Sequence, residues 1–272
     1  IISTVLTHAF GGSAGREGAA LQLGGSLGGT IGKWLKLDEY DQKVMIMCGM
    51  SAAFSALFGT PLTATIFAME VVSIGIMEYA ALVPCAIASL IAREMANMVG
   101  AHAEQFPVPA SVTLDIKSGA LIVLLALLCA AVSILFCEVL HRTERLFKSR
   151  MKNPWIRVVV GALLVIVLAK VLGTTDYLGA GMNIVERAIH GETEPAAFLL
   201  KIIFTAITLS CGFKGGEIVP TLFVGATFGC LFGQVTGLSP SLTAACGMAA
   251  VFCGVTNSPI SSLLLSFELF GF

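Results

Sequence analysis

Long apolar stretches separated by short polar ones form the main pattern along the chain. Apolar segments lie near residues 1–32, 44–58, 60–77, 79–99, 118–140, 156–173, 196–212, 218–233, 240–255 and 258–270. Residues 118–137 include no charged side chain, and none falls in the 50 residues between Glu217 and Glu268. Because a helix needs about 20 apolar residues to cross a bilayer, the pattern predicts an all-α, polytopic membrane protein. Several segments are shorter than this and begin at Gly or Pro, which is typical of the helices that form a transporter's binding site.

Composition agrees with this pattern and limits the kinds of partner and cofactor to expect. The 272 residues are 56% hydrophobic and only 12% charged, and the mean hydropathy is +0.91. The net charge of -1 and the lack of a basic tract give no reason to expect a nucleic-acid partner. Eight cysteines occupy apolar surroundings without a CxxC motif, so we expect small buried side chains and predict no metal site and no cofactor. The chain starts without methionine, and we expect further helices on both sides of it.

The chain contains an internal repeat. Residues 48–61 (CGMSAAFSALFGTP) align without a gap on residues 246–259 (CGMAAVFCGVTNSP), with six identical positions, and a glutamate follows each proline by nine residues (Glu70 and Glu268). Upstream, glycines at every fourth position recur at an offset of 201 residues (24, 28 and 32 against 225, 229 and 233). Small residues at this spacing predict close helix packing. We interpret residues 1–272 as one transport domain with halves at about 1–100 and 196–272, joined by helices 118–140 and 156–173.

A basic stretch predicts the orientation in the membrane. The segment 142–157 holds six basic side chains and one acidic one, so we expect a cytoplasmic loop there. The loops expected at 100–117 and 174–195 are acidic in balance and belong outside. The alternative is that these charged residues are simply exposed to solvent and give no information about the orientation of the chain in the membrane.

In each half a glycine-rich turn precedes a helix start: GSAGREGAALQLGG near residue 16 and CGFKGGEIVPTLFVG near residue 217. The first amides of a helix lack partners and lie at its positive end, so two such ends form an anion site made of backbone groups. Glu17 would compete with the anion at such a site, as a gate that leaves or takes up a proton. The alternative is that Glu17 pairs with Arg16 and fixes the turn. A nucleotide-binding loop is excluded, because Gly18 is followed by alanines rather than by lysine.

These motifs resemble the CLC family of chloride channels and proton-coupled anion exchangers. GREG with LQLGGSLG is similar to the first family signature, and KGGEIVP with GATFG is similar to the second. FGTPLTATIFAMEV and VTNSPISSLLLSFEL resemble the proline-led helices that follow them. The resemblance implies an inverted repeat with re-entrant and short tilted helices. It also implies a homodimer in the lipid bilayer of a bacterial inner membrane, with one pathway per subunit for a small inorganic anion, chloride or fluoride. It also implies that Glu17 gates the pathway and that the amides of Arg16, Glu17, Gly18, Ile218 and Val219 line it.

Three positions depart from the family pattern. Ala19 replaces the proline that usually follows GREG, and Val71 stands where exchangers carry an internal proton-transfer glutamate. Glu70 fits the neighbouring structural glutamate better, and we expect both Glu70 and Glu268 to support helix ends. Glu217 occupies an apolar position of the second signature, which resembles the fluoride/proton exchanging branch, although that branch usually has threonine where Val219 stands. Glu217 is therefore a candidate proton or anion site, and pairing with Lys214 is the alternative.

Other classes of function fit less well. An intramembrane enzyme would need a nucleophile–base pair or paired aspartates within apolar helices, and the aspartates lie in or beside expected loops, so we predict no enzyme. A membrane scaffold would not need two glycine-rich helix starts with glutamates. The four histidines (8, 102, 141 and 190) are scattered, and none is assigned a role. The prediction is halide transport, as a channel or as a proton/anion antiporter, with fluoride/proton antiport and a non-transporting scaffold as the alternatives. The central serine and tyrosine of the family are expected outside this chain.

Overall fold

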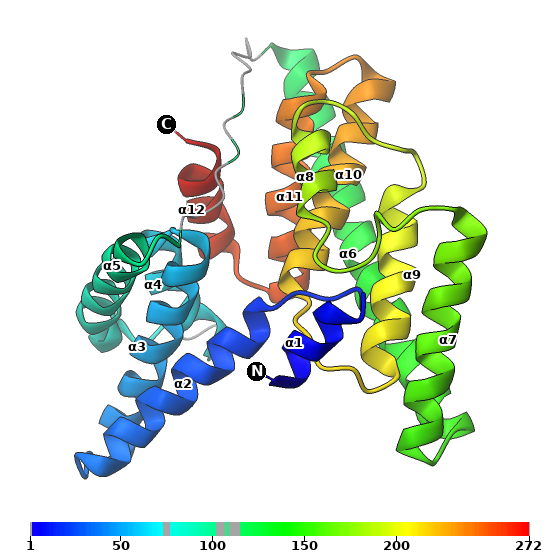
Figure 1. The fold of residues 1–272 in the computed structure, drawn as a ribbon. Coiled ribbons are helices and arrows are strands. Elements are labelled where there is room, and N and C mark those ends of the chain that lie inside the picture. The colour runs from blue at the N-terminus through cyan, green and yellow to red at the C-terminus, as the bar shows by residue number, and fades with distance from the viewer. Residues whose placement is uncertain (1, 73–76, 102–105, 107, 109–114, 272) are drawn as a thin grey trace. The chain divides into compact units, whose positions relative to one another are not determined.

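The structure, a computed structural model, describes residues 2–72, 77–101, 106, 108 and 115–271 (Figure 1). Helices account for nearly all of the regular structure in this described part, where strand pairing is confined to one isolated bridge. The all-α prediction is therefore confirmed. Most of the loop expected at 100–117 lies outside the described residues.

The helices divide between two compact units. Unit 1 takes its residues from 1–16 and 108–255, and unit 2 from 17–107 and 256–272. Unit 1 contains α1 (Ile2–Ala9), α6 (Ile116–Arg150), α7 (Pro154–Leu172), α8 (Met182–Ile189), α9 (Ala197–Ser210), α10 (Ile218–Thr236) and α11 (Pro240–Thr256). Unit 2 contains α2 (Glu17–Trp34), α3 (Glu39–Phe58), α4 (Pro61–Val72), η1 (Tyr79–Ala81), α5 (Leu82–Met98) and α12 (Pro259–Phe270). This division cuts across the sequence halves, because α12 belongs to the second half and packs against α4 of the first.

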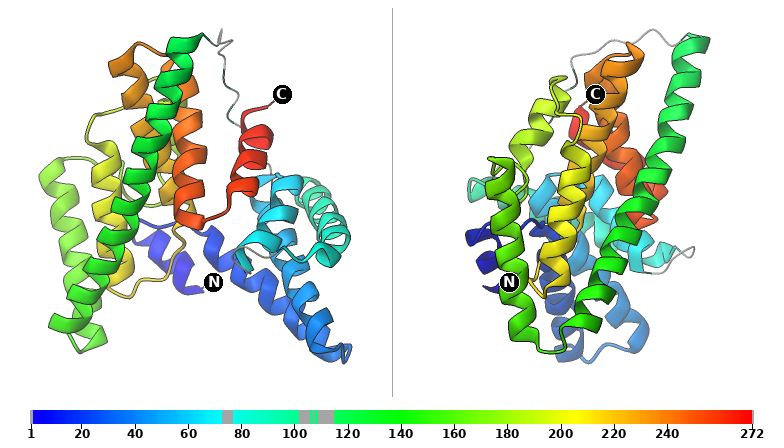
Figure 2. Two further views of the ribbon diagram at one scale, coloured as in Figure 1. Left: turned by 180° about the vertical axis from the view of Figure 1, so that it is seen from behind. Right: turned by 90° about the vertical axis from the view of Figure 1, so that its right-hand side faces the viewer.

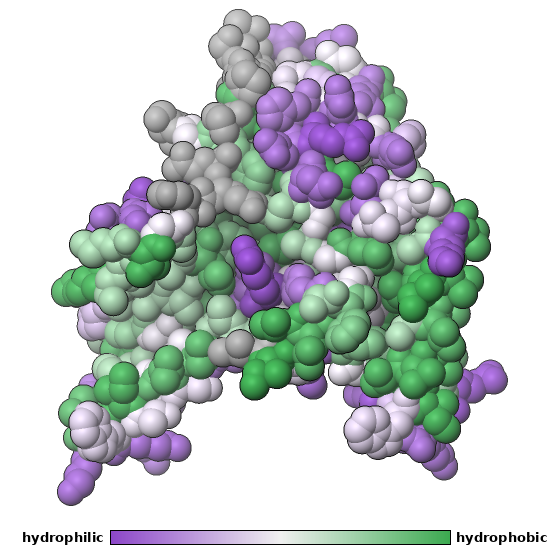
Figure 3. All heavy atoms as spheres, in the orientation of Figure 1, coloured by the Kyte–Doolittle hydropathy of each residue, from purple (hydrophilic) through white to green (hydrophobic). Residues whose placement is uncertain are grey.

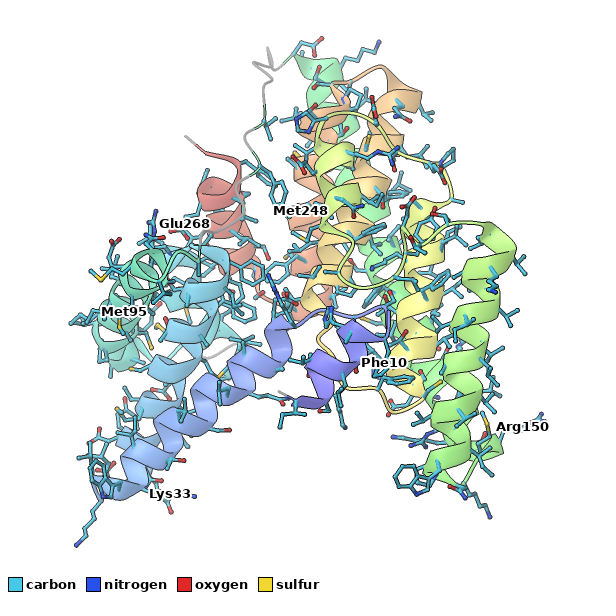
Figure 4. The ribbon with its side chains drawn as sticks, in the orientation of Figure 1. Phe10, Lys33, Met95, Arg150, Met248 and Glu268 are labelled. Atoms are coloured by element: carbon cyan, nitrogen blue, oxygen red, sulfur yellow. The ribbon has the colours of Figure 1, made fainter. Side chains whose placement is uncertain are left out.

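Both long and short apolar helices are present, as predicted. Four helical stretches of the described chain are long and apolar enough to cross a membrane: 79–98, α6, α7 and α10. The helices α4, α9, α11 and α12 are apolar but shorter. Large apolar side chains are exposed along α7, and Figure 3 shows this face as continuous apolar surface with hydrophilic residues at the end where Figure 4 labels Arg150. Such a surface suits contact with lipid.

The core of unit 1 is formed by α6, α9, α10 and α11. Figure 2 shows α6 and α9 side by side, and α10 packs against both. Their contact faces bury a cluster of ten side chains with at most 8% exposure: Leu125, Cys129, Val132, Phe136, Leu140, Ile202, Ala206, Val224, Phe232 and Val251. These helices are apolar on nearly every side, which agrees with packing in the core on one face and lipid on the other.

Two segments expected as loops are partly helical. The basic segment 142–157 continues α6 to Arg150, and α7 begins at Pro154. Ion pairs four residues apart, Glu138 with Arg142 and Glu144 with Lys148, favour the helix, and the Asn153 side chain accepts the Trp155 amide to start α7. Within the acidic segment 174–195, α8 buries Ile184, Val185, Ala188 and Ile189 on one face. Its eight residues form too short an amphipathic pattern to have indicated a helix.

The repeated glycines hold equivalent helix pairs together, one pair in each unit. A Cβ on Gly28 of α2 would lie 2.1 Å from the carbonyl oxygen of Met45 on α3, and a Cβ on Gly229 of α10 would lie 2.1 Å from that of Thr243 on α11. Gly24 and Gly49 likewise approach each other's carbonyl groups, as their counterparts Gly225 and Gly247 do. The predicted close packing along these glycines is confirmed, and the contact recurs at the same repeat positions.

Within unit 2, the two repeat glutamates cap each other's helices. The Glu268 carboxylate, on the residue labelled in Figure 4, accepts the amides of Leu62 (3.0 Å) and Thr63 (2.8 Å) at the start of α4. The Glu70 carboxylate accepts the equivalent amides of Ile260 (3.2 Å) and Ser261 (2.9 Å) at the start of α12. Each glutamate lies near the end of its own helix, so α4 and α12 run antiparallel and exchange the same contact. Two helices that exchange the same contact in opposite directions are related by a local two-fold axis. In this unit the repeat is therefore an inverted one. The prediction that both glutamates support helix ends is confirmed.

Removing either cap is expected to destabilise unit 2. Glu70→Ala or Glu268→Ala leaves two amides at a helix start without their charged acceptor, and we expect each change to cost about 2 kcal/mol of unfolding free energy. Thermal unfolding of the purified protein in detergent measures this. Glu94→Ala, on the exposed side of α5, is the matched control and is expected to change little. Equal melting temperatures for all three variants would contradict the capping role.

Candidate functional site

The first glycine turn is anchored to α9 by polar side chains. Gly12 donates its amide to the Thr7 carbonyl of α1 at 2.8 Å. Ser13 then donates its amide to the Thr208 hydroxyl, and its own hydroxyl shares a hydrogen bond with that of Thr205, both at 3.1 Å. All three hydroxyl-bearing residues of this contact are fully buried. An apolar helix therefore carries two threonines at the places where the turn needs partners.

The two glycine turns meet in unit 1. Gly15 donates its amide to the Gly216 carbonyl at 2.8 Å, and Gly216 returns the bond to the Gly15 carbonyl at 2.6 Å. A Cβ on Gly215 would lie 2.3 Å from the Cβ of Ala14, so only glycine fits there. The prediction that the turns from the two sequence halves lie together is confirmed for Gly15 and Gly216.

The start of α10 offers free backbone donors. Its first intrahelical bond runs from the Thr221 amide to the Glu217 carbonyl, and Pro220 has no amide hydrogen. Within the described residues, the amides of Ile218 and Val219 have no backbone acceptor. These two donors lie at the positive end of a 19-residue helix, the arrangement that binds anions. Val219 is buried and Ile218 is half-buried.

The corresponding start of α2 belongs to unit 2. Glu17 is its first residue and is only 4% exposed, whereas Gly18 is half-buried. Arg16, the last residue of the turn in unit 1, is exposed. Ala19 aligns with Pro220 at the repeat offset of 201 and, unlike proline, has an amide hydrogen. The first turn of α2 therefore has one more potential donor than that of α10.

Glu217 lines a polar cavity of about 230 Å³ within unit 1. The cavity lies between α6 and the segment that joins α9 to α10, and its walls are Cys137, Leu140, His141, Glu144, Leu209, Ser210, Phe213, Lys214, Gly215 and Glu217. Glu217 is exposed, and its side chain makes no capping bond to α10. Among the described residues of this cavity, Glu217 and Lys214 form no ion pair. The carboxylate is available to protons from solvent.

The chain matches a known protein family over its full length. The family described as voltage gated chloride channel matches residues 1–272, the whole chain. The chain belongs to the CLC family. A chloride/fluoride channel protein of Pseudomonas syringae pv. tomato is 32% identical over 277 residues, which cover this chain completely and 61% of the relative. CLC proteins are integral to membranes, in agreement with the apolar helices.

Solved CLC structures share the fold. A CLC-type fluoride/proton antiporter matches with a TM-score of 0.95 and 35% identity, over 99% of this chain and 68% of that one. A slow cyanobacterial Cl-/H+ antiporter matches with a TM-score of 0.78 and 19% identity, over 97% of this chain and 65% of that one. The chain thus spans between 61% and 68% of the length of these CLC relatives.

Two side chains near these elements were not predicted from the sequence. Lys201 on α9 is completely buried, and its ammonium group donates to the carbonyl oxygens of Tyr177 (3.3 Å) and Gly179 (2.8 Å). It also lies 5.0 Å from the ring centre of Phe223 on α10, within the range of a cation–π contact. A single lysine in an apolar segment reveals neither contact. The second residue is His141, whose place in the cavity depends on packing between distant segments.

Proposed function

We propose that the full-length protein is a CLC-type transporter that exchanges fluoride for protons across a membrane. The observation that carries the proposal is the reciprocal pair of bonds between Gly15 and Gly216, which joins the two turns that lead into α2 and α10. A helix start offers unpartnered amides, and amides hold an anion without the full charge that would prevent its release. The resemblance of the chain to a fluoride/proton antiporter at a TM-score of 0.95 supports fluoride and antiport.

The proposal assigns a role to each predicted residue. Ile218 and Val219 donate amides to the anion, and the amides of Arg16, Glu17 and Gly18 are their counterparts at α2. Glu17 is the gate, because a buried carboxylate at a helix start occupies the place of an anion until it is displaced or protonated. Glu217 carries the proton. Val71 has no carboxylate, and Glu70 is already engaged in capping α12.

Chloride transport is the second candidate function. The relative from Pseudomonas syringae is named a chloride/fluoride channel protein, and amide donors accept either halide. We also propose a homodimer in a bacterial inner membrane with the basic segment 142–157 in the cytoplasm. The resemblance to the CLC motifs and the positive charge of that segment support these two points.

Reconstituted liposomes test the proposal. The purified full-length protein is placed in vesicles loaded with potassium fluoride or potassium chloride, and efflux is followed with ion-selective electrodes. Fluoride efflux that drives protons inward, and that a proton gradient drives in turn, supports antiport. Fluoride efflux without proton movement indicates a channel, and preferred chloride efflux indicates the second candidate. If neither anion moves, a non-transporting scaffold is the better interpretation.

Glu217→Ile tests the proton role of this glutamate. Isoleucine cannot bind a proton, so we expect proton movement per fluoride to fall by about 10²-fold, and the preference for fluoride over chloride to weaken. Lys214→Met is the control, since it removes a charge from the same cavity but no proton-binding carboxylate. Unchanged coupling and unchanged anion preference in Glu217→Ile would remove Glu217 from the mechanism.

A further inference from the structure

The cavity beside Glu217 brings together several ionisable side chains from distant parts of the chain. His141 and Glu144 lie one turn apart on α6, and Lys214 and Glu217 come from the segment before α10. His141, Glu144, Lys214 and Glu217 are all exposed, so water reaches this cluster. A wet cavity that holds both an imidazole and a carboxylate is a route along which protons can move between them.

His141 has its basic nitrogen available. Its Nδ1 lies 2.7 Å from the carbonyl oxygen of Cys137, one turn earlier on α6. A carbonyl oxygen only accepts hydrogen bonds, so Nδ1 carries the hydrogen and Nε2 holds the lone pair of the neutral ring. The contact fixes the tautomer and leaves Nε2 as the atom that takes up a proton.

The other ionisable groups are less suited to pass a proton to Glu217. Glu144 is paired with Lys148 on α6, which stabilises its charged form. The Lys214 ammonium group has three donor hydrogens and no lone pair, so it cannot accept a proton from solvent. Arg157 of α7 donates to the Cys211 carbonyl at 3.4 Å and is always charged. The charged and titratable groups that interact with His141 or share its cavity are Cys137, Glu138, Glu144, Lys214 and Glu217.

We propose that His141 is a proton-carrying residue that transfers protons between solvent and Glu217 through the water of this cavity. Nε2 binds a proton from solvent and gives the imidazolium ion. The imidazolium then releases that proton to a bridging water as the water passes one of its own to a Glu217 carboxylate oxygen, which leaves neutral histidine and a neutral carboxyl group. The reverse sequence returns the proton. This inference rests on the proposed function, because it gives the route by which the exchanged proton reaches Glu217.

The matched histidine in the chain provides the control. His190, at the end of α8, makes the same bond from Nδ1 to a carbonyl four residues earlier (Glu186, 2.8 Å), and it does not line the cavity. We compare the full-length wild type, His141→Gln, His141→Ala and His190→Gln in fluoride-loaded liposomes, with fluoride and proton fluxes recorded together between pH 5.5 and 8.

In His141→Gln we expect proton flux to fall by about tenfold and to lose the dependence on pH that the wild type shows across this range. Added imidazole is expected to restore proton flux in His141→Ala, because the cavity of about 230 Å³ admits the small ring. Rescue separates proton transfer from a structural role, which free imidazole would not repair. His190→Gln is expected to behave as the wild type.

The outcomes of this experiment separate the two proposals. If the wild type exchanges fluoride for protons and His141→Gln keeps the same proton flux and pH profile, the proton route through His141 is wrong and the proposed function stands. A slowed His141→Ala that imidazole does not restore also overturns the route. If the wild type moves no protons with fluoride, the proposed antiport itself fails.

Discussion

Replacement of Glu17 by Gln is expected to abolish proton movement with fluoride and to leave a fluoride flux that no longer depends on pH. Glutamine has nearly the size of glutamate but neither a negative charge nor a proton-binding oxygen. It therefore cannot compete with an anion for free amides, nor take up a proton when displaced. We expect proton flux to fall by about 10²-fold or more. The measurement is paired recording of fluoride and pH in liposomes that contain the full-length protein.

The chain offers a control with the same position in a helix. Glu39 is the first residue of α3, as Glu17 is of α2, but it is exposed rather than buried. Glu39→Gln is expected to retain both the proton coupling and the pH dependence of the wild type. If Glu17→Gln behaves in the same way as Glu39→Gln, Glu17 is not the gate, and the burial of its carboxylate serves the local structure alone.

The features predicted best from the sequence are those that occur in both halves of the internal repeat. The glycines at 24, 28 and 32 recur at 225, 229 and 233, and this repetition alone indicates a shared packing contact. Glu70 and Glu268 are expected to support helix ends for the same reason. What the repeat cannot reveal is the direction of the partner, because an offset in sequence carries no information about antiparallel capping.

The errors have two physical causes. Charged residues in the segment 142–157 indicated a loop, but their spacing of four residues stabilises a helix, so α6 continues to Arg150. His141 and Lys201 were missed because their roles depend on partners far along the chain: a cavity shared with residues 209–217 for the histidine, and the carbonyl groups of residues 177 and 179 for the lysine. Local patterns do not encode such contacts.

Gly28→Ala and Gly229→Ala are expected to be strongly and equally destabilising. In both, the new methyl group would lie 2.1 Å from a backbone carbonyl oxygen of the partner helix, where no side-chain rotation gives relief. The two helices of each pair must move apart to make room for the methyl group, and we expect this to lower the free energy of unfolding by about 3 kcal/mol. One of these glycines lies in each unit, and the two make equivalent contacts in the repeat. A similar loss of unfolding free energy in both variants would show that the two helix pairs contribute equally to stability.

Gly119→Ala is the control for the glycine pair. Gly119 lies on α6 with no neighbouring atom within 4 Å of an added Cβ, so alanine there removes backbone freedom without a clash and is expected to be neutral or slightly stabilising. Thermal unfolding in detergent, followed by the fluorescence of Trp34 and Trp155, reports on both units because one tryptophan ends α2 and the other begins α7. A melting temperature of Gly28→Ala or Gly229→Ala equal to that of Gly119→Ala would show that the helix pairs tolerate separation, and the close packing would then not be what selects glycine at these positions.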